Sequence, residues 1–313
     1  MTEPAVLILA EDADDYLPSL TGLLRQGVEV ATASDSASVL AAWSGQEVLL
    51  AQPDLAAAVL KDLPGIHWVQ STWAGVEPLL GAGRRDYLLT GVRDVFGPMM
   101  SEYVFGYLLA HELRMTARRQ HQKSRRWWPE DSGSLNGKVL GVMGTGSIGR
   151  HIAGTGVSFG LRVLGYSRSG RPVDGFERVY SPSQLFEFLP RLDYLVAVLP
   201  RTRETDGLLD ARAFGAMRPS CVLVNVGRGN AVNQAALGAA LRQGQLAGAV
   251  LDVFGDEPLP ADSPLWDAPG CTVTAHVAAR SRPEDIARIF VENYNRYVAG
   301  EALNYLVDFE RGY

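Results

Sequence analysis

The sequence predicts an α/β fold with two doubly wound parallel sheets, and three observations support this prediction. Short apolar runs alternate with helix-like segments along the chain, which is the rhythm of parallel strands joined by crossover helices. A glycine-rich turn at residues 144–149 follows one of these runs in the middle of the chain. Two long helix candidates bracket the segment that contains this turn. A whole module therefore precedes the turn, and the unit that contains it is expected to be inserted into another.

The strands of the first unit are expected to be short apolar runs, rich in Val and Leu. The candidates are Val6–Leu9, Val28–Ala31, Val48–Ala51, His67–Gln70 and Tyr87–Leu89. Runs of the same kind recur after the glycine turn and predict a second sheet. They are Arg162–Tyr166, Tyr194–Leu199, Cys221–Val226, Ala247–Asp252 and Cys271–Thr274.

The glycine turn predicts a dinucleotide-binding Rossmann unit. It follows the apolar run Lys138–Met143 and opens a helix-like stretch, so phosphates would meet the free amides of a helix N-terminus. Gly144 permits the tight bend, Gly146 lets the backbone approach a pyrophosphate, and Gly149 allows close packing of helix on strand. An ordinary glycine turn is the alternative, and the apolar residues on both sides favour the nucleotide. The cofactor residues expected here are Gly144, Thr145, Gly146, Ser147, Ile148 and Gly149.

Two long helices are expected to bridge the units, one from Met99 to about Arg119 and one at Pro283–Ala299. The second begins with a proline, which suits the first turn of a helix. The last residues would then return to the first sheet. The predicted domains are residues 1–98 with 283–313 for the substrate and 99–282 for the dinucleotide, with a ligand-binding cleft between them.

Composition excludes several classes of protein. The 313 residues are 47% hydrophobic, which is ample for two packed cores. A net charge of −6 argues against a nucleic-acid binder, so the cluster Arg118, Arg119, Lys123, Arg125 and Arg126 is interpreted as a solvated helix end. Acidic residues near the N-terminus and a short apolar run lead us to expect no signal peptide or membrane span, no metal-ligand cluster is expected, and the two cysteines fit a reducing cytoplasm.

Several motifs follow one another along the chain: the run Ser71–Val76, the glycine turn, Leu199-Pro200 with Thr202, Asn225–Gly229, Leu251–Phe254, Glu257–Leu259 and His276. This ordered series resembles the D-isomer-specific 2-hydroxyacid dehydrogenase family over nearly the whole chain. The stretches Met100–Tyr103, His276–Ala279 and Arg311–Tyr313 look closest to its glyoxylate and hydroxypyruvate reductase branch. The resemblance implies a Rossmann cofactor domain inserted into a flavodoxin-like substrate domain, and a homodimer formed through the cofactor domains and the Met99 helix region.

Arg228 is the predicted substrate anchor. It follows a strand and precedes a glycine, which places a planar guanidinium at the carboxyl edge of the sheet, where ligands of such sheets bind. The resemblance assigns it the carboxylate and the carbonyl oxygen of a 2-oxo acid. A surface arginine is the alternative, and the surrounding Asn225–Gly229 motif favours the catalytic role.

His276 is the predicted acid and base. It follows the last strand candidate, and the resemblance makes it the group that protonates the carbonyl oxygen. Glu257 would hydrogen-bond to the imidazole, fix its tautomer and stabilise the imidazolium. A neutral core histidine is the alternative. Ala275 stands where the family commonly has proline, so the geometry of this loop is less defined than the role.

Further site residues follow from the resemblance. Asp252 would contact the nicotinamide carboxamide, or else cap a helix. The amides of Ala74, Gly75 and Val76 would form a second grip for the carboxylate. Trp73 would restrict the pocket to short substrates, or else pack against Trp68 or Leu79. The remaining cofactor contacts are Leu199, Pro200, Thr202, Val226 and Gly227.

The strand after the glycine helix predicts a preference for NADP(H). A site selective for NAD places Asp or Glu about 20 residues beyond the glycines, to bind the ribose 2′-hydroxyl. Ser167 occupies that position instead, Arg168 and Arg171 supply charge for a 2′-phosphate, and Ser169 adds a hydroxyl. Solvated arginines are the alternative, and NAD(H) remains an expected second cofactor.

The sequence therefore predicts an NADPH-dependent reductase of short 2-oxo acids, with glyoxylate and hydroxypyruvate as first candidates and D-2-hydroxy acids as products. One alternative keeps the fold but takes a bulkier or phosphorylated substrate. Another is a dinucleotide-sensing scaffold without catalysis, against which the set Arg228, Glu257 and His276 argues. Trp127 and Trp128 are expected to lie in the dimer interface or between the domains.

Overall fold

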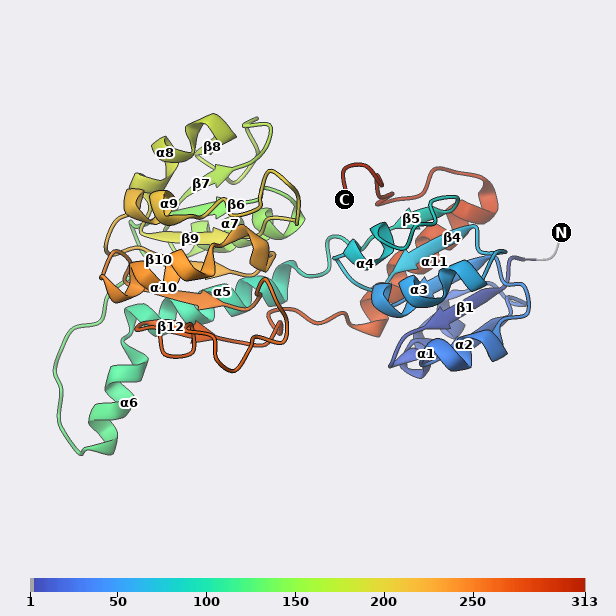
Figure 1. The fold of residues 1–313 in the computed structure, drawn as a ribbon, viewed down its shortest axis with the longest axis horizontal. Helices are drawn as coiled ribbons and strands as arrows, with labels where there is room; N and C mark the ends of the chain where they lie inside the picture. Colours follow the sequence, from blue (N-terminus) through green and yellow to red (C-terminus); the bar gives the residue numbers. More distant parts are fainter. Residues whose placement is uncertain (1–2, 313) are drawn as a thin grey trace. The chain divides into compact units, whose positions relative to one another are not determined.

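The computed structural model describes residues 3–312 and consists of two compact units (Figure 1). One unit combines the chain up to Val95 with the chain from Ser281 onward, and the other is Phe96–Arg280. Tyr313, the end of the tail motif, lies outside the described residues. Within the described residues, no helix is long and apolar enough to cross a membrane.

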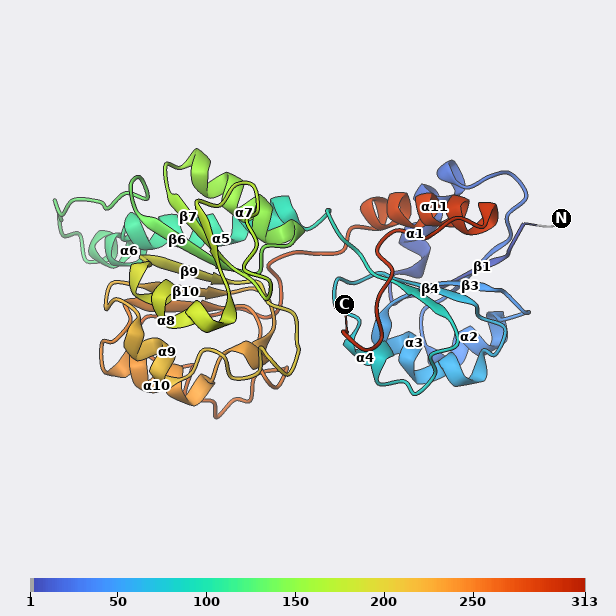
Figure 2. The ribbon, with the colours of Figure 1, turned by 90° about the horizontal axis from the view of Figure 1, so that it is seen from above.

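The first unit is a parallel sheet with the strand order β2-β1-β3-β4-β5, the flavodoxin-like order. Helices α2, α3 and α4 cover one face and bury the core around Leu7, Leu49 and Val69, while α1 and α11 cover the other (Figure 2). The elements are β1 Val6–Leu9, α1 Ala13–Leu23, β2 Val30–Ala33, α2 Ser36–Ala42, β3 Val48–Ala51, α3 Pro53–Val59, η1 Leu60–Asp62, β4 Trp68–Ser71, α4 Glu77–Leu80, β5 Leu88–Thr90 and α11 Pro283–Ala299.

The C-terminal segment completes the first unit, as the sequence predicts. Helix α11 begins at the predicted proline and lays Phe290 on the buried Trp68, with 5.3 Å between ring centroids. Asn293 donates to the side chain of Gln70 at 3.2 Å. Beyond the helix, Leu306 forms an antiparallel bridge with Thr90. These contacts make the unit discontinuous in sequence.

The second unit is a seven-stranded parallel sheet with the order β12-β11-β10-β9-β6-β7-β8. The order reverses at β6, where Rossmann sheets bind the dinucleotide. Apolar side chains pack α5 and α7 on one face and α8, α9 and α10 on the other (Figure 2). The elements are α5 Gly97–Glu112, α6 Met115–Lys123, β6 Val139–Met143, α7 Ser147–Ser158, β7 Arg162–Tyr166, β8 Arg178–Tyr180, η2 Pro182–Gln184, α8 Leu185–Phe188, η3 Leu189–Arg191, β9 Tyr194–Ala197, α9 Ala211–Ala216, β10 Val222–Asn225, η4 Gly229–Ala231, α10 Gln234–Arg242, β11 Gly248–Leu251 and β12 Cys271–Val273.

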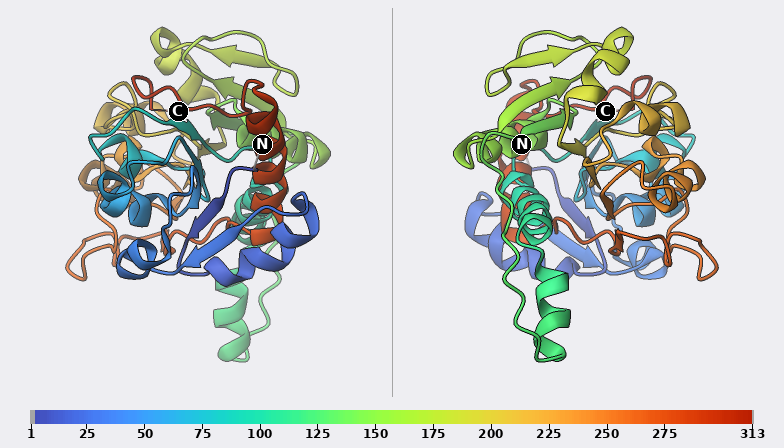
Figure 3. Two further views of the ribbon diagram at one scale, coloured as in Figure 1. Left: turned by 90° about the vertical axis from the view of Figure 1, so that its right-hand side faces the viewer. Right: turned by 90° about the vertical axis from the view of Figure 1, so that its left-hand side faces the viewer.

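The prediction of one long helix from Met99 to about Arg119 is wrong. The chain breaks between α5 and α6, where Arg114 adopts a left-handed conformation with φ of 51°. None of the α6 residues is buried, so no packing holds it in line with α5, and it stands away from its own sheet (Figure 3). Strand β8 is missing from the prediction because only its last two residues are buried, which leaves no apolar run. Strands β9 to β12 end one or two residues earlier than predicted, whereas β2, β4 and β5 lie one or two residues later than predicted.

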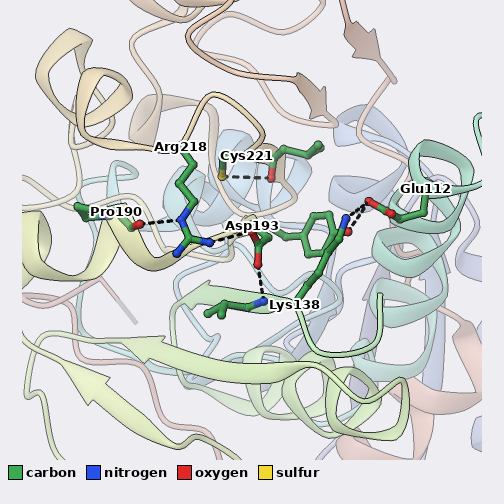
Figure 4. A network of polar contacts seen from close by, with 9 residues as sticks. Glu112, Lys138, Pro190, Asp193, Arg218 and Cys221 are labelled. Atoms are coloured by element: carbon green, nitrogen blue, oxygen red, sulfur yellow. Dashed lines mark hydrogen bonds and ion pairs between the residues drawn. The ribbon is translucent and has the colours of Figure 1, made fainter. Parts of the chain in front are cut away.

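A polar network fixes the edge of the second sheet where β6 and β9 begin (Figure 4). The carboxylate of Asp193 accepts from the amide of Val139 at 2.8 Å and from Arg218 at 2.9 Å. Glu112, at the end of α5, receives Lys138 Nζ and the Tyr194 hydroxyl, both at 2.6 Å. Burial raises the pKa of Glu112, but these two bonds outweigh it and the net direction is downward. These contacts stabilise the fold at the end where the strands begin. The candidate site lies at the opposite end, where the parallel strands finish.

Candidate active site

The glycine turn lies at the carboxyl end of β6, and protein contacts explain two of its three glycines. Gly144 has a φ of +105°, and a Cβ there would lie 2.5 Å from the carbonyl oxygen of Val198. A Cβ on Gly149 would collide with the carbonyl oxygen of Gly144. Both positions therefore require glycine if α7 is to start this close to the strand.

Gly146 has no such protein explanation. A Cβ there would meet nothing within 4 Å, and the backbone angles of −75° and −164° suit any residue. Helix α7 begins at the next residue, Ser147, and no side chain caps its first turn. Thr145 and Ile148 are partly buried on either side. Open space before uncapped helix amides fits a pyrophosphate, so the residues present fit a dinucleotide.

The loop after β9 borders this turn. Thr205 ties it together, because its hydroxyl donates to the carbonyl of Pro200 at 2.8 Å and accepts from the amide of Thr202 at 2.9 Å. Leu199 is 7% exposed. A Cβ on Gly227, after β10, would lie 2.6 Å from the amide nitrogen of Leu199. The loops after β9 and β10 therefore touch through their backbones, beside the predicted cofactor residue Val226.

Arg228 lies between two glycines that the fold requires. Gly227 faces the Leu199 backbone, and a Cβ on Gly229 would collide with the backbone of Phe254 in the loop after β11. The buried Asn225 closes the turn: its Nδ2 donates to the Arg228 carbonyl at 3.1 Å and its Oδ1 accepts from the Gly227 amide at 3.2 Å. Arg228 Nη1 donates to the Gly227 carbonyl at 2.9 Å. The guanidinium is therefore displayed on a rigid turn at the sheet edge.

His276 and Glu257 form a direct pair. The imidazole Nδ1 lies 2.8 Å from Glu257 Oε2, while Glu257 Oε1 accepts from the amide of Phe254 at 2.8 Å. The side chains are 52% and 36% exposed, so the pair is open on one side. Because the carboxylate is held by its own loop, it fixes Nδ1 as a donor and leaves Nε2 for a substrate.

Asp252 is buried and is not a helix cap. It is 1% exposed, and its oxygens accept from the amides of Val277 and Ala278 at 2.9 Å each and from the Thr274 hydroxyl at 2.6 Å. Its carbonyl accepts from the amide of His276 at 2.8 Å. Asp252 therefore organises the loop that carries His276, and its contact with a nicotinamide stays a prediction.

The predicted 2′-phosphate loop is a compact turn after β7. Ser167 Oγ accepts from the amide of Gly170 at 3.2 Å, and Ser169 Oγ accepts from the amide of Arg171 at 3.3 Å. Arg168 and Arg171 are exposed. Arg168 is among the cations that hold the pKa of Glu204 below its usual range, after backbone and Thr202 hydrogen bonds to that carboxyl. The loop between residues 167 and 171 contains no acid.

The substrate loop belongs to the first unit and follows β4. Ser71 shapes it: its hydroxyl donates to the carbonyl of Trp73 at 2.8 Å and accepts the amide of the same residue at 3.0 Å. Among the described residues, none accepts a hydrogen bond from the amides of residues 74–76. Trp73 is 38% exposed, while Trp68 is engaged with Phe290. Successive free amides are the donor set of an anion nest.

Comparison with known proteins identifies the family to which this chain belongs. The family model described as "D-isomer specific 2-hydroxyacid dehydrogenase, NAD binding domain" matches residues 105–278. The chain belongs to the D-isomer specific 2-hydroxyacid dehydrogenase family. It is therefore an NAD(P)-dependent 2-hydroxyacid dehydrogenase or reductase.

Relatives within the family share most of the chain. The glyoxylate/hydroxypyruvate reductase A of Serratia proteamaculans is 34% identical over 68% of this chain and 68% of its own length. A D-isomer specific 2-hydroxyacid dehydrogenase family protein from Aeromonas salmonicida superposes with a TM-score of 0.93 at 45% identity, covering 98% of this chain and 99% of its own. The NADPH-dependent glyoxylate/hydroxypyruvate reductase of Sinorhizobium meliloti, solved with NADP and sulfate, gives 0.89 at 30% identity over 99% and 100%. The predicted family and fold are confirmed.

The structure of this dehydrogenase shows where the predicted catalytic residues lie, while their roles stay predictions. Arg228, Glu257 and His276 follow three adjacent parallel strands, β10, β11 and β12, and so lie at one edge of the sheet. The prediction missed the residues that hold them, Asn225 and Thr274. Both are polar residues at or just after the carboxyl end of a strand, and that placement was the signal.

Proposed function

We propose that this dehydrogenase is an NADPH-dependent reductase of short 2-oxo acids, of the glyoxylate and hydroxypyruvate type, and forms D-2-hydroxy acids. The observation that carries the proposal is the His276–Glu257 pair, with Nδ1 and Oε2 2.8 Å apart, at the sheet edge that also bears the glycine turn. A paired, half-exposed imidazole beside a dinucleotide site has the geometry of a general acid.

The roles of the residues follow from their chemistry. When bound, the reduced nicotinamide supplies the hydride. Arg228 binds the substrate carboxylate and polarises the carbonyl. Within the first unit, the free amides of residues 74–76 are a donor set for an anion such as a carboxylate. His276 Nε2 donates the proton that the carbonyl oxygen needs as carbon is reduced. Glu257 stabilises the imidazolium before that transfer.

The cofactor preference for NADP(H) rests on the loop after β7. Residues 167–171 of this loop offer Arg168, Arg171 and two hydroxyls, and they include no carboxylate that would repel a 2′-phosphate. The Sinorhizobium meliloti reductase, a relative over 99% of this chain, is described as NADPH-dependent and was solved with NADP. Both observations support NADPH over NADH.

A homodimer is part of the proposal and rests on the surface of α6. This helix has no buried residue, and Trp127 beyond it is 92% exposed. Residues 113–129 carry cations and no acid, in a chain whose net charge is −6. The guanidinium groups of Arg114 and Arg118 lie over the ring of Trp128, so this tryptophan already packs against residues of the same segment. We propose that this basic segment, residues 113–129, packs on a second copy of the chain and that Trp127 is covered there.

A substrate panel with NADPH and NADH in parallel tests the proposal. We expect oxidation of NADPH with glyoxylate and hydroxypyruvate, and weaker turnover with NADH and with bulkier or phosphorylated 2-oxo acids. His276→Ala should abolish most turnover while leaving NADPH binding intact. Tight NADPH binding without turnover across the panel would instead support the dinucleotide-sensing scaffold.

A further inference from the structure

We infer that Tyr103 and Thr274 are positioning residues for His276: with Asp252 they form a directed hydrogen-bond chain that holds the loop bearing the imidazole. The inference rests on the proposed role of His276 as the acid. It adds two side chains that lie outside the motifs of the site, one of them on α5, 171 positions away from the other in sequence.

The direction of the chain follows from its donors. Asp252 accepts from two backbone amides and, as a carboxylate, has no hydrogen to give. The Thr274 hydroxyl therefore spends its single hydrogen on Asp252 Oδ1, 2.6 Å away. Tyr103 OH, 2.6 Å from Thr274 Oγ1, must then be the donor of the next bond. Each hydroxyl polarises the next, and the chain ends on a buried negative group.

The chain holds a backbone that an ordinary residue avoids. His276 has a φ of 54°, in the left-handed region that favours glycine. Three consecutive amides, of His276, Val277 and Ala278, all donate to Asp252, the first to its carbonyl and the others to its carboxylate. The loop is wrapped around one residue, so the orientation of that carboxylate sets the direction of the imidazole.

Tyr103 is suited to anchor the far end of the chain. It lies on α5, where its ring packs 4.8 Å from the ring of Tyr107. Burial raises the pKa of Tyr103, more than its hydrogen bond with Thr274 lowers it. The phenol therefore stays protonated, and remains a donor, at any pH at which the enzyme works. The proton on Thr274 then stays directed at Asp252.

The test compares Thr274→Val, Thr274→Ser and Tyr103→Phe with wild type. Thr274→Val keeps the shape and removes the hydroxyl, whereas Thr274→Ser keeps it. Thr272→Val is the matched control, since it makes the same change at an exposed position two residues earlier, in β12. We expect Thr274→Val to lower kcat about tenfold, because misplacing a reacting group by a fraction of an ångström slows transfer on this scale.

Positioning has a signature that a loss of stability does not share. The KM for the 2-oxo acid and the Kd for NADPH should change less than about threefold in Thr274→Val, and the solvent deuterium isotope effect on kcat should rise. Thr274→Ser should recover most of the wild-type kcat. Tyr103→Phe is expected to fold normally, and its kcat should lie between those of Thr274→Val and Thr274→Ser. Thr272→Val should behave as wild type.

A readout without turnover separates this inference from the proposed function. Carbethoxylation of His276 by diethyl pyrocarbonate, followed by peptide mass spectrometry, should be faster in Thr274→Val because the loop is released. A wild-type chain inactive on every 2-oxo acid would refute the proposed function alone. Wild-type kcat in Thr274→Val, equal losses in Thr274→Val and Thr274→Ser, or, for a chain without turnover, unchanged carbethoxylation would overturn the positioning.

Discussion

Gly146→Ala should separate cofactor binding from folding. A Cβ at this position meets no protein atom within 4 Å, and the φ of −75° is open to alanine. The apoprotein should therefore lose nothing on substitution. It should gain about 0.4–1 kcal/mol, because alanine restricts the unfolded chain more than glycine does. For a chain of this size, that corresponds to a rise in Tm of about 1–3 °C.

Gly146→Ala should instead weaken the binding of the dinucleotide. The added methyl group would occupy the space through which the pyrophosphate approaches the amides at the start of α7. Losing one hydrogen bond to a charged group costs about 1.5–3 kcal/mol, which raises the Kd about 10- to 100-fold. Isothermal titration calorimetry measures the Kd for NADPH. Differential scanning calorimetry measures the Tm of the apoprotein.

Gly154→Ala is the matched control. It lies in the same helix, α7, and a Cβ there also meets nothing within 4 Å. It should stabilise the apoprotein by about 0.5–1 kcal/mol as a helix-interior replacement and leave the Kd for NADPH unchanged. Wild-type affinity in Gly146→Ala would refute the assignment of the pyrophosphate to this turn. A destabilised apoprotein would show that the turn itself needs glycine.

Three further predictions concern other parts of the chain. Replacing Arg168 and Arg171 by alanine should lower kcat/KM for NADPH about 10-fold or more and leave that for NADH nearly unchanged; equal losses would contradict a 2′-phosphate role. Trp127→Glu should shift sedimentation from dimer to monomer without changing the far-ultraviolet circular dichroism, since the side chain is 92% exposed in one copy. The pKa of Glu112 is lowered in the fold, so its contribution to stability is present above the ordinary glutamate pKa and is lost as the pH falls through the folded value. The acid side of the Tm–pH curve should therefore be shallower in Glu112→Gln, and an unchanged slope would contradict the ion pair with Lys138.

Much of the fold could be predicted because parallel strands are short, buried and apolar. Val6–Leu9, Val48–Ala51 and Arg162–Tyr166 have the predicted bounds, and Val48–Ala51 lies directly between the polar residues Glu47 and Gln52. Strand β8 and the break at Arg114 could not be predicted in the same way. The first has too little apolar sequence, and the second depends on the absence of anything for α6 to pack against, which is a tertiary property.

The position of some site residues could likewise be predicted from sequence, whereas the conformation of others could not. Residues at the carboxyl ends of strands, such as Arg228, could be predicted because the parallel sheet brings those ends to one edge. The conformation of the His276 loop could not, because its determinants come from β11, β12 and α5.

Ala275 illustrates what the missing information does. Where the family commonly has proline before the histidine, this chain has a residue that imposes little on the backbone, and the loop geometry looked uncertain from sequence. The structure supplies a different constraint: three amides after Ala275 bind one buried aspartate, and they hold His276 at a φ of 54° without a proline ring. The precision of the imidazole then depends on hydrogen bonds to Asp252 rather than on local chain stiffness. In such a loop, the substitutions that should alter proton transfer most are those that reorient this aspartate, even when the substituted residue lies far away in sequence, as Tyr103 on α5 does.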